Sequence, residues 1–306
     1  MKIRPKGSAA SPLVIENVRQ LRKLDMVSVR PREMPLGHIL CTPTFFGVEH
    51  EINEFMRGNV GKEELLTAIG QWFDLIKVLS FISAVKPLPM VATPGLPDMV
   101  FAANAGLTYK EGGGRPTFIP SSMWHWSRDG ETRFYTEYMR QLGYDIQLIP
   151  DGHVFEGQGD ALWHPGKMLL WGGYGQRSTE SAYEAISAML GIPVIALELV
   201  SKFYHLDTCF CPLDERTVLY YPGAFTGAGR NMIQQMFARA IVATKKQAET
   251  FACNSIVVGE NIIMPEGDGA IPFVLEKWGF NVICVDMSEF LKSGGAARCL
   301  ALDHYV

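Results

Sequence analysis

A repeated pattern of strands and helices constrains the fold of this chain more than any other feature of its sequence. Short β-like runs bounded by turn residues come in pairs, and each pair is followed by a helical pattern and then by a further β-like run. This unit of strand, strand, helix and strand recurs about every 45 to 55 residues. Such a period predicts radial repetition around a central axis and differs from the single alternation of strands and helices in a Rossmann chain.

The repeat can be followed through nearly the whole chain, which we therefore expect to be one α/β domain over 36–306, preceded by a lead-in segment over 1–35. The predicted strand pairs are 99–109 with 117–120, 159–164 with 168–172, 208–212 with 217–221, 253–258 with 261–264, and 297–302 with 37–44. The predicted helices are 73–81, 132–142, 181–190, 232–243 and 270–277, and the strands predicted after helices are 145–149, 193–197 and 281–285.

Composition narrows the classes of function. Of the 306 residues 47% are hydrophobic, which is enough for a large core. The net charge of -4 lacks the basic excess of a nucleic-acid binder, and no apolar run approaches the roughly 20 residues of a membrane span. We expect a cytoplasmic protein that acts on a small molecule and binds neither nucleic acid nor membrane; a homo-oligomer is compatible with this.

The basic N-terminal segment and the cysteines call for no special chemistry. Residues 1–32 lack the apolar core or clean amphipathic helix of a targeting segment, so we interpret them as a solvated lead-in. The six cysteines have neither the spacing of a small disulfide scaffold nor the paired histidines of a zinc site. We therefore expect no metal ion and no cofactor.

Four short segments place polar residues where the apolar strands of the repeat begin. In a radial architecture these segments converge on the axis, where we expect the functional site. Taken singly, each residue has an ordinary structural role, since cysteine and histidine are often buried in cores and carboxylates often cap turns. Cys253-Asn254 takes the equivalent place in the fourth repeat, and we interpret Asn254 as a turn residue. The segments contain Asp98 with Asn104, Glu156, His205 with Asp207, and Cys299 after a Gly-Gly turn.

In this order the segments resemble those of the guanidino-group-modifying enzymes of the pentein fold. That superfamily includes arginine deiminases, dimethylargininases, amidinotransferases and the arginine and succinylarginine dihydrolases. The resemblance extends from about Gly37 to the C-terminus. It implies a five-bladed α/β propeller built from ββαβ units, which agrees with the period of the repeat.

The resemblance also implies roles for individual residues. Cys299 matches the family's nucleophile, His205 its general acid/base and Glu156 the carboxylate of the catalytic triad. The implied substrate-binding residues are Asp207 at the guanidino group, Arg177 at the substrate's carboxylate, and Asp98, Asn104 and Asn53.

Asn104 is the position that separates the activities of the superfamily. The resemblance implies aspartate there in deiminases, asparagine in the arginine and succinylarginine dihydrolases, and Glu-Asp in dimethylargininases where this chain has Ala103-Asn104. The segment around Asn53 is also similar to the cyanobacterial type of arginine dihydrolase. An amide both donates and accepts hydrogen bonds, so it suits a neutral citrulline held for a second attack. We therefore expect an arginine dihydrolase, with arginine deiminase or a dimethylargininase-like hydrolase as alternatives.

The chemistry of a guanidino group fits these residue types. A guanidinium is a poor electrophile, so attack requires a thiolate whose pKa is lowered or that has a cationic partner nearby. Burying the cation requires carboxylates, which Glu156 and Asp207 would supply. The expected intermediate is an S-alkylthiouronium on Cys299, which water then hydrolyses. A ribosome-binding factor of the same fold is a remote alternative, and it predicts no such Cys-His-Glu set.

Overall fold

Five small sheets make up the protein in a computed structural model that describes residues 13–82 and 86–306. In each sheet the first two strands are antiparallel and the third is parallel to the second. The sheets are β4 (Gly106–Tyr109), β5 (Thr117–Pro120) and β6 (Asp145–Ile146); β7 (Ala161–Trp163), β8 (Leu170–Tyr174) and β9 (Pro193–Glu198); β10 (Phe210–Asp214), β11 (Thr217–Tyr220) and β12 (Arg239–Val242); β13 (Ile256–Val258), β14 (Asn261–Pro265) and β15 (Asn281–Val285); and β16 (Leu302–His304), β2 (Gly37–Cys41) and β3 (Lys86–Met90).

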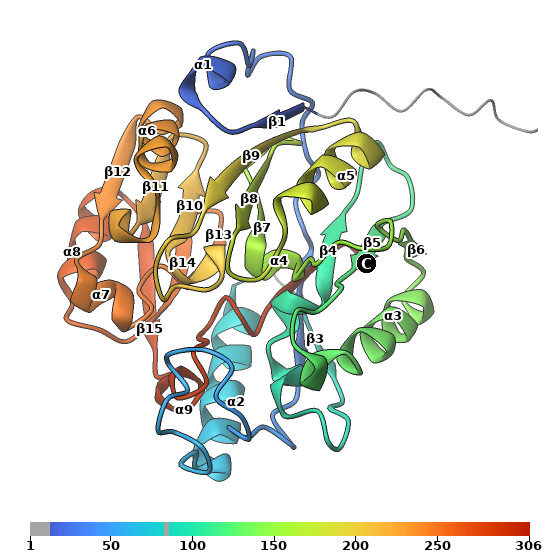
Figure 1. The fold of residues 1–306 in the computed structure, drawn as a ribbon. Coiled ribbons are helices and arrows are strands. Elements are labelled where there is room, and N and C mark those ends of the chain that lie inside the picture. The colour runs from blue at the N-terminus through green and yellow to red at the C-terminus, as the bar shows by residue number, and fades with distance from the viewer. Residues whose placement is uncertain (1–12, 83–85) are drawn as a thin grey trace, which may run out of the picture.

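One helix joins the two parallel strands of every sheet, so each unit has the strand, strand, helix, strand order that the sequence predicts. In Figure 1 the helices of the first four sheets lie at the periphery, whereas the short α4 (Gly157–Asp160) lies near the middle. The fifth sheet pairs the last strand, β16, with β2 near the start of the chain. The helices are α3 (Glu131–Gln141), α5 (Glu180–Leu190), α6 (Gly227–Met236), α8 (Ala270–Lys277) and α2 (Leu65–Phe81).

The lead-in segment contributes one further strand. β1 (Leu13–Ile15) runs parallel to β9 and extends the second sheet to four strands. The short helix α1 (Val18–Leu21) follows it, capped by the Asn17 side chain, which accepts a hydrogen bond from the Gln20 amide. The first basic residues of the chain, at positions 2, 4 and 6, lie outside the described residues.

Two features of the predicted element bounds are wrong. The predicted helix over 232–243 ends at Met236, because residues 239–242 extend and pair with β11 as strand β12. In addition, the first strand of each pair begins later than predicted; β4, for example, begins at Gly106 and not at 99. The residues before it form two short 3₁₀ helices, η1 (Pro97–Val100) and η2 (Ala102–Ala105). Apolar content suggested a strand, but close packing at the centre of the molecule selects tight turns there.

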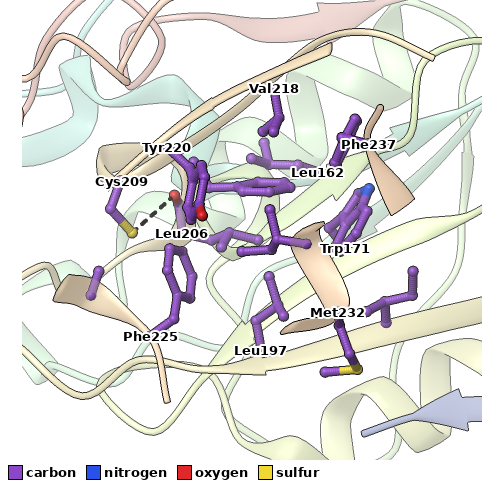
Figure 2. Close-up of a cluster of buried hydrophobic side chains, with 14 of the residues drawn as sticks. Leu162, Trp171, Leu197, Leu206, Cys209, Val218, Tyr220, Phe225, Met232 and Phe237 are labelled. Carbon is purple, nitrogen blue, oxygen red and sulfur yellow. Dashed lines mark hydrogen bonds between the residues drawn. The ribbon is translucent and has the colours of Figure 1, made fainter. Parts of the chain in front are cut away.

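A large apolar cluster connects the second and third sheets and supports the turn that precedes β10. Figure 2 shows Trp171 of β8 packed among side chains from β10, β11 and the segment after α6. Its ring stacks on Phe237 with centroids 5.4 Å apart. Leu206 and Cys209 belong to the same cluster, and the Cys209 thiol donates to the Leu206 carbonyl over 3.5 Å. The core therefore fixes the backbone on either side of Asp207.

We expect Trp171→Ala to lower the free energy of unfolding by about 3 to 5 kcal/mol, because the change leaves a large cavity in a close-packed core. Trp126→Ala is the matched control, since that ring is 71% exposed, and it should cost no more than about 0.5 kcal/mol. Urea denaturation followed by circular dichroism measures both. Equal losses of stability in the two variants would contradict the assignment of Trp171 to the core.

Candidate active site

The predicted site residues come together where the turns that precede the first strands meet. The short helix α4 (Gly157–Asp160), which follows Glu156, packs against η2 and against η4 (Leu206–Thr208). The segment that ends in Cys299 lies against η2 as well, because the Ala103 amide donates to the Cys299 carbonyl over 3.0 Å. Residues nearly 200 positions apart in the sequence thus share one centre, as the repeat predicts.

A buried hydrogen bond joins Glu156 and His205. The ring Nε2 lies 2.7 Å from Glu156 Oε2, and both side chains are about 2% exposed. The other carboxylate oxygen accepts from the backbone amide of Trp124 at 2.8 Å. Burial alone would raise the pKa of Glu156, but the hydrogen bond and charge of His205, with Arg128 and Arg177 nearby, lower it to about 2. Each oxygen of Glu156 therefore has one hydrogen-bond partner, and the contact with Nε2 orients the His205 ring.

Glycine next to Glu156 is required by the crowding of the backbone. Gly157 has φ +57°, and a Cβ there would lie 2.5 Å from the backbone nitrogen of Gly106. Asp160 closes the same turn, because it accepts hydrogen bonds from Ser178 and from the backbone amide of Leu206. Asp160 thus has the structural role that its place in the sequence suggests, and it holds the turn that carries His205.

Cys299 is buried beside Asp207. Its sulfur lies 3.3 Å from Asp207 Oδ2, and the thiol donates to the carboxylate. Burial, followed by the negative charge of Asp207, raises the pKa of the Cys299 thiol well above its ordinary value. Burial likewise raises the pKa of Asp207, although His205 and Cys299 oppose that shift. Within the described residues Asp207 Oδ1 is buried without a hydrogen-bond partner, and Asp207 reaches the site through its contact with Cys299 and not as part of the cavity lining.

Asn104 lies between His205 and Arg128, a residue that the sequence analysis did not identify. Its Nδ2 is 3.4 Å from His205 Nδ1, and its Oδ1 accepts from the Arg128 guanidinium at 2.9 Å. Arg128 is held in turn by two hydrogen bonds of 2.8 Å to Glu131. Because an arginine is only a donor, it fixes the amide of Asn104 with the nitrogen toward the histidine. An arginine and a glutamate three residues apart near a helix start are the signal that could have indicated this pair.

Asp98 completes this side of the cavity. Its Oδ1 accepts a hydrogen bond of 3.3 Å from the Ser293 hydroxyl, and its backbone carbonyl accepts one of 3.2 Å from Arg128. Burial raises the pKa of Asp98, while the charge of Arg128 opposes the shift. The residue therefore lines the site, and Ser293 is the donor to its carboxylate.

Arg177 contacts the loop that contains Asn53. One guanidinium nitrogen of Arg177 donates to the Ile52 carbonyl over 2.5 Å, and its Nε is 3.8 Å from Glu156. The guanidinium also lies 4.4 Å from the ring centroid of Trp124. Asn53 accepts from the next backbone amides along the chain and donates to the Ser293 carbonyl at 3.1 Å. The Asn53 amide therefore connects this loop by a hydrogen bond to the segment that leads to Cys299.

The cavity between these side chains is small. Its volume is about 10 Å³, which is room for roughly one water molecule. A larger hollow of about 520 Å³ lies elsewhere, lined in part by Trp163, Leu213 and Val257. We assign the chemistry to the smaller cavity because it contains the buried carboxylate, histidine and thiol. Its lining includes Asn53, Asp98, Asn104, Arg128, Glu156, Arg177, His205 and Cys299.

Two further observations concern residues 13–82 and 86–306 alone. No group of three or more His, Cys, Asp or Glu side chains in them is arranged to hold a metal ion. None of the helices in this part of the chain has the length and apolar character needed to cross a membrane.

Comparison with known families identifies the type of protein. The family model described as N,N dimethylarginine dimethylhydrolase, eukaryotic, matches residues 52–306. This chain belongs to that family of guanidino-modifying hydrolases. One family relative is the N(G),N(G)-dimethylarginine dimethylaminohydrolase of Mycobacterium tuberculosis. It is 34% identical over 271 residues, which are 87% of this chain and 85% of the relative.

Other relatives within this guanidino-modifying group are dihydrolases of arginine. The bifunctional arginine dihydrolase/ornithine cyclodeaminase AgrE of Nostoc sp. is 37% identical over 269 residues, covering 86% of this chain and 37% of AgrE. The chain therefore spans little more than a third of that relative. A crystal structure of the N-terminal domain of the cyanobacterial arginine dihydrolase ArgZ, as a cysteine-to-serine variant bound to substrate, matches with a TM-score of 0.83 and 35% identity. It covers 88% of this chain and 97% of that domain, and the shared mixed α/β fold is the pentein fold.

The raised pKa of Cys299 predicts a slow reaction with neutral alkylating agents in the ligand-free protein. We expect modification of Cys299 by iodoacetamide to accelerate as the pH rises, without levelling off below about pH 9, because the thiolate is the reactive form. Cys284, which is exposed, is the internal control and should react first at every pH. Peptide mapping by mass spectrometry measures both sites. Complete modification of Cys299 at pH 7 ahead of Cys284 would contradict a protonated resting thiol.

Proposed function

We propose that this protein is an arginine dihydrolase, which converts L-arginine and two water molecules into ornithine, carbon dioxide and two ammonia. The observation that carries this proposal is Asn104, an amide where a deiminase is expected to have a carboxylate, 3.4 Å from Nδ1 of His205. An amide is able to hold a neutral ureido group as well as a cation. The likeness to AgrE and ArgZ, both described as arginine dihydrolases, supports the same activity.

The first round removes one ammonia. The thiolate of Cys299 attacks the guanidino carbon, and a carbon–sulfur bond forms. Ammonia leaves with a proton from His205, which generates the thiouronium intermediate. Since Nε2 of His205 is engaged by Glu156, the proton is carried on Nδ1, the nitrogen toward Asn104. Water then gives a proton back to His205 and attacks the same carbon, the carbon–sulfur bond breaks, and citrulline is left beside the thiolate.

The second round repeats these steps on the ureido carbon. Attack by Cys299 and loss of a second ammonia leave a thiocarbamate on the sulfur. Water attacks its carbonyl, the electron pair of the carbon–sulfur bond returns to sulfur, and the released carbamate loses carbon dioxide to give ornithine. The thiolate leaves twice in the cycle, so groups that stabilise it act in both rounds.

The cationic substrate supplies the charge that the resting site lacks. In the ligand-free protein the thiol of Cys299 is protonated and donates to Asp207. A guanidinium placed against Asp207 takes over that carboxylate as an ion pair, removes the charge that disfavours the thiolate, and adds a positive charge beside sulfur. Binding of the substrate therefore activates its own nucleophile.

Access for arginine requires movement of the wall that contains Ile52 and Asn53. A cavity of about 10 Å³ is much smaller than an amino acid, which occupies a volume on the order of several water molecules. The bond from Arg177 to the Ile52 carbonyl is the contact that must open. In the open state Arg177 is free to bind the substrate's α-carboxylate with a charge-assisted pair.

Hydrolysis of dimethylarginine is the second candidate. The family model that matches this chain and the M. tuberculosis relative are both named for that activity. Against it stands the Ala103-Asn104 pair, where the resemblance implies Glu-Asp in dimethylargininases. The two activities differ in product, since dimethylarginine releases dimethylamine.

The proposal extends to the architecture. Pairing of β16 with β2 joins the two ends of the chain in one sheet, which supports a closed five-bladed propeller around the site. Residues 36–306 would form this catalytic domain, with 1–35 as its lead-in and arginine as its partner. A homo-oligomer in the cytoplasm is compatible with it.

A product time course by mass spectrometry tests the activity. Wild-type protein should convert arginine to ornithine with about two ammonia released, and Cys299→Ser should show no turnover, because a hydroxyl is a weak nucleophile at neutral pH. Cys284→Ser, at an exposed position, is the matched control and should keep wild-type activity. Accumulation of citrulline alone would replace the dihydrolase by a deiminase, and dimethylamine formed from dimethylarginine in preference to arginine would favour the second candidate.

Asn104→Asp should shift the product from ornithine to citrulline. A carboxylate faces the neutral ureido group with acceptors only, and it favours the cationic substrate over citrulline by Coulombic attraction. The variant should release about one ammonia per arginine, as measured in the same time course. Equal ornithine yields from both proteins would show that Asn104 does not determine the outcome.

Arg177→Ala should raise the Michaelis constant for arginine by about 10- to 100-fold, with a smaller change in the turnover number, because it removes a charge-assisted contact remote from the reacting carbon. Arg216→Ala, at an exposed arginine that does not line the cavity, is the control. Comparison with agmatine, which lacks the α-carboxylate, isolates the contact. Wild-type protein that uses agmatine as well as arginine would refute the assignment.

A further inference from the structure

Asn254 contacts both Cys299 and Asp207. It is fully buried in the segment between α7 (Lys245–Glu249) and β13. Its Nδ2 donates to the Cys299 sulfur at 3.1 Å and to the Asp207 carbonyl at 3.2 Å. Its Oδ1 accepts from the backbone amides of Ala296 and Cys299, both at 3.2 Å. Every hydrogen-bonding group of this side chain is thus used on the nucleophile and its neighbours.

We infer that Asn254 is the residue that positions the sulfur of Cys299 and stabilises it as a thiolate. An N–H donor stabilises a thiolate more than a thiol, because only the thiolate carries negative charge on sulfur. The inference rests on the proposed reaction, in which sulfur is negative before each attack and again when each carbon–sulfur bond breaks and its electron pair returns to sulfur.

A neutral donor suits this place better than a cation. A lysine or arginine at the same distance would stabilise the thiolate more strongly, but it would repel the guanidinium that has to approach Asp207. An amide donates a hydrogen bond without net charge. Asn254 therefore opposes the rise that burial causes in the pKa of the Cys299 thiol. Because the amide carries no net charge, the site still favours a cationic substrate.

The acceptor side of Asn254 defines the backbone around the nucleophile. Because Oδ1 accepts from the amides of Ala296 and Cys299, the turn after Gly294-Gly295 is closed around one amide oxygen. The Arg298 amide also donates to the backbone carbonyl of Asn254 at 3.2 Å. Asn254 is absent from the lining of the active-site cavity, so it acts on the reaction through Cys299 and not through contact with substrate.

The test uses two substitutions and one matched control in the full-length protein. Asn254→Asp keeps the shape and the acceptor oxygen but loses the amide donor, and Asn254→Ala removes both. Ser255→Ala removes a neighbouring side chain that is equally buried and donates only to the Ala252 carbonyl. The readout is the pH dependence of Cys299 modification by iodoacetamide, followed on the Cys299 peptide by mass spectrometry.

We expect both Asn254 variants to shift the Cys299 titration to higher pH by about one unit, which lowers the modification rate about tenfold at a fixed pH on the rising limb. Ser255→Ala should titrate as the wild type does. Thermal unfolding of each variant separates loss of folding from loss of the donor, and Asn254→Ala provides the test if Asn254→Asp does not fold. If either folded Asn254 variant shows the same pH dependence of Cys299 modification as the wild type, the inference is wrong. An equal shift in Ser255→Ala would also overturn it.

Steady-state kinetics provide the second readout. With arginine, the turnover number of Asn254→Asp should fall at least about tenfold while the Michaelis constant changes less than about threefold, because the residue does not contact substrate. A raised Michaelis constant with an unchanged turnover number would overturn the inference. The alkylation experiment needs no substrate, so a wild-type protein inactive on arginine whose Asn254 variants still shift the thiol titration would refute the proposed function and retain the role of Asn254.

Discussion

The buried hydrogen bond between Glu156 and His205 is the interaction on which the site depends. A carboxylate and an imidazole that are both nearly inaccessible to water cannot rely on solvent, so each must be held by protein groups. The backbone amide of Trp124 occupies the second oxygen of Glu156, and Asn104 meets the second nitrogen of His205. These contacts fix the histidine ring, with Nε2 held by the carboxylate at 2.7 Å and Nδ1 at the longer distance of 3.4 Å from the Asn104 amide. The segments around the pair thus supply its remaining hydrogen-bond partners.

The tight turns before the first strands position the other reactive groups. In several units a tight turn, and not a strand, precedes the first β-strand, and the turn directs its polar side chains to the centre while its apolar ones enter the core. In the segment of η4, Leu206 packs into the cluster around Trp171, whereas His205 lines the cavity and Asp207 contacts Cys299. Rigid packing beneath the turn thus positions the groups above it. Crowding at the centre explains why Gly157 follows Glu156 and why Gly294-Gly295 precedes the turn that carries Cys299.

The electrostatics of the resting site favour a protonated thiol. Asp207 and burial together disfavour the thiolate of Cys299, and the Asn254 donor opposes them. Within residues 13–82 and 86–306, Asp207 Oδ1 has no hydrogen-bond partner. In the proposed reaction the guanidinium of the substrate fills this place and adds a positive charge beside the thiol. Arg128 does not fill that place, because Glu131 and Asn104 hold its guanidinium. In the proposed reaction, selectivity for a cation and protection of the nucleophile would therefore arise from one arrangement.

The sequence by itself determined the repeat, the five helical regions, and the segments that carry Glu156, His205, Asp207 and Cys299, because periodicity and turn residues are local signals. Its local preferences did not decide where strands begin, since apolar residues near 99–105 suit a strand as well as a buried turn. Residues such as Arg128 and Asn254 gain their importance from partners far along the chain, and sequence spacing does not encode those distances. Only the tertiary structure decided that Glu156 is hydrogen-bonded to His205, and that Cys299 is buried beside Asp207, which raises the pKa of its thiol. The physical reason is that burial and hydrogen-bond partners, which set the charge of each group, exist only once the turns have come together.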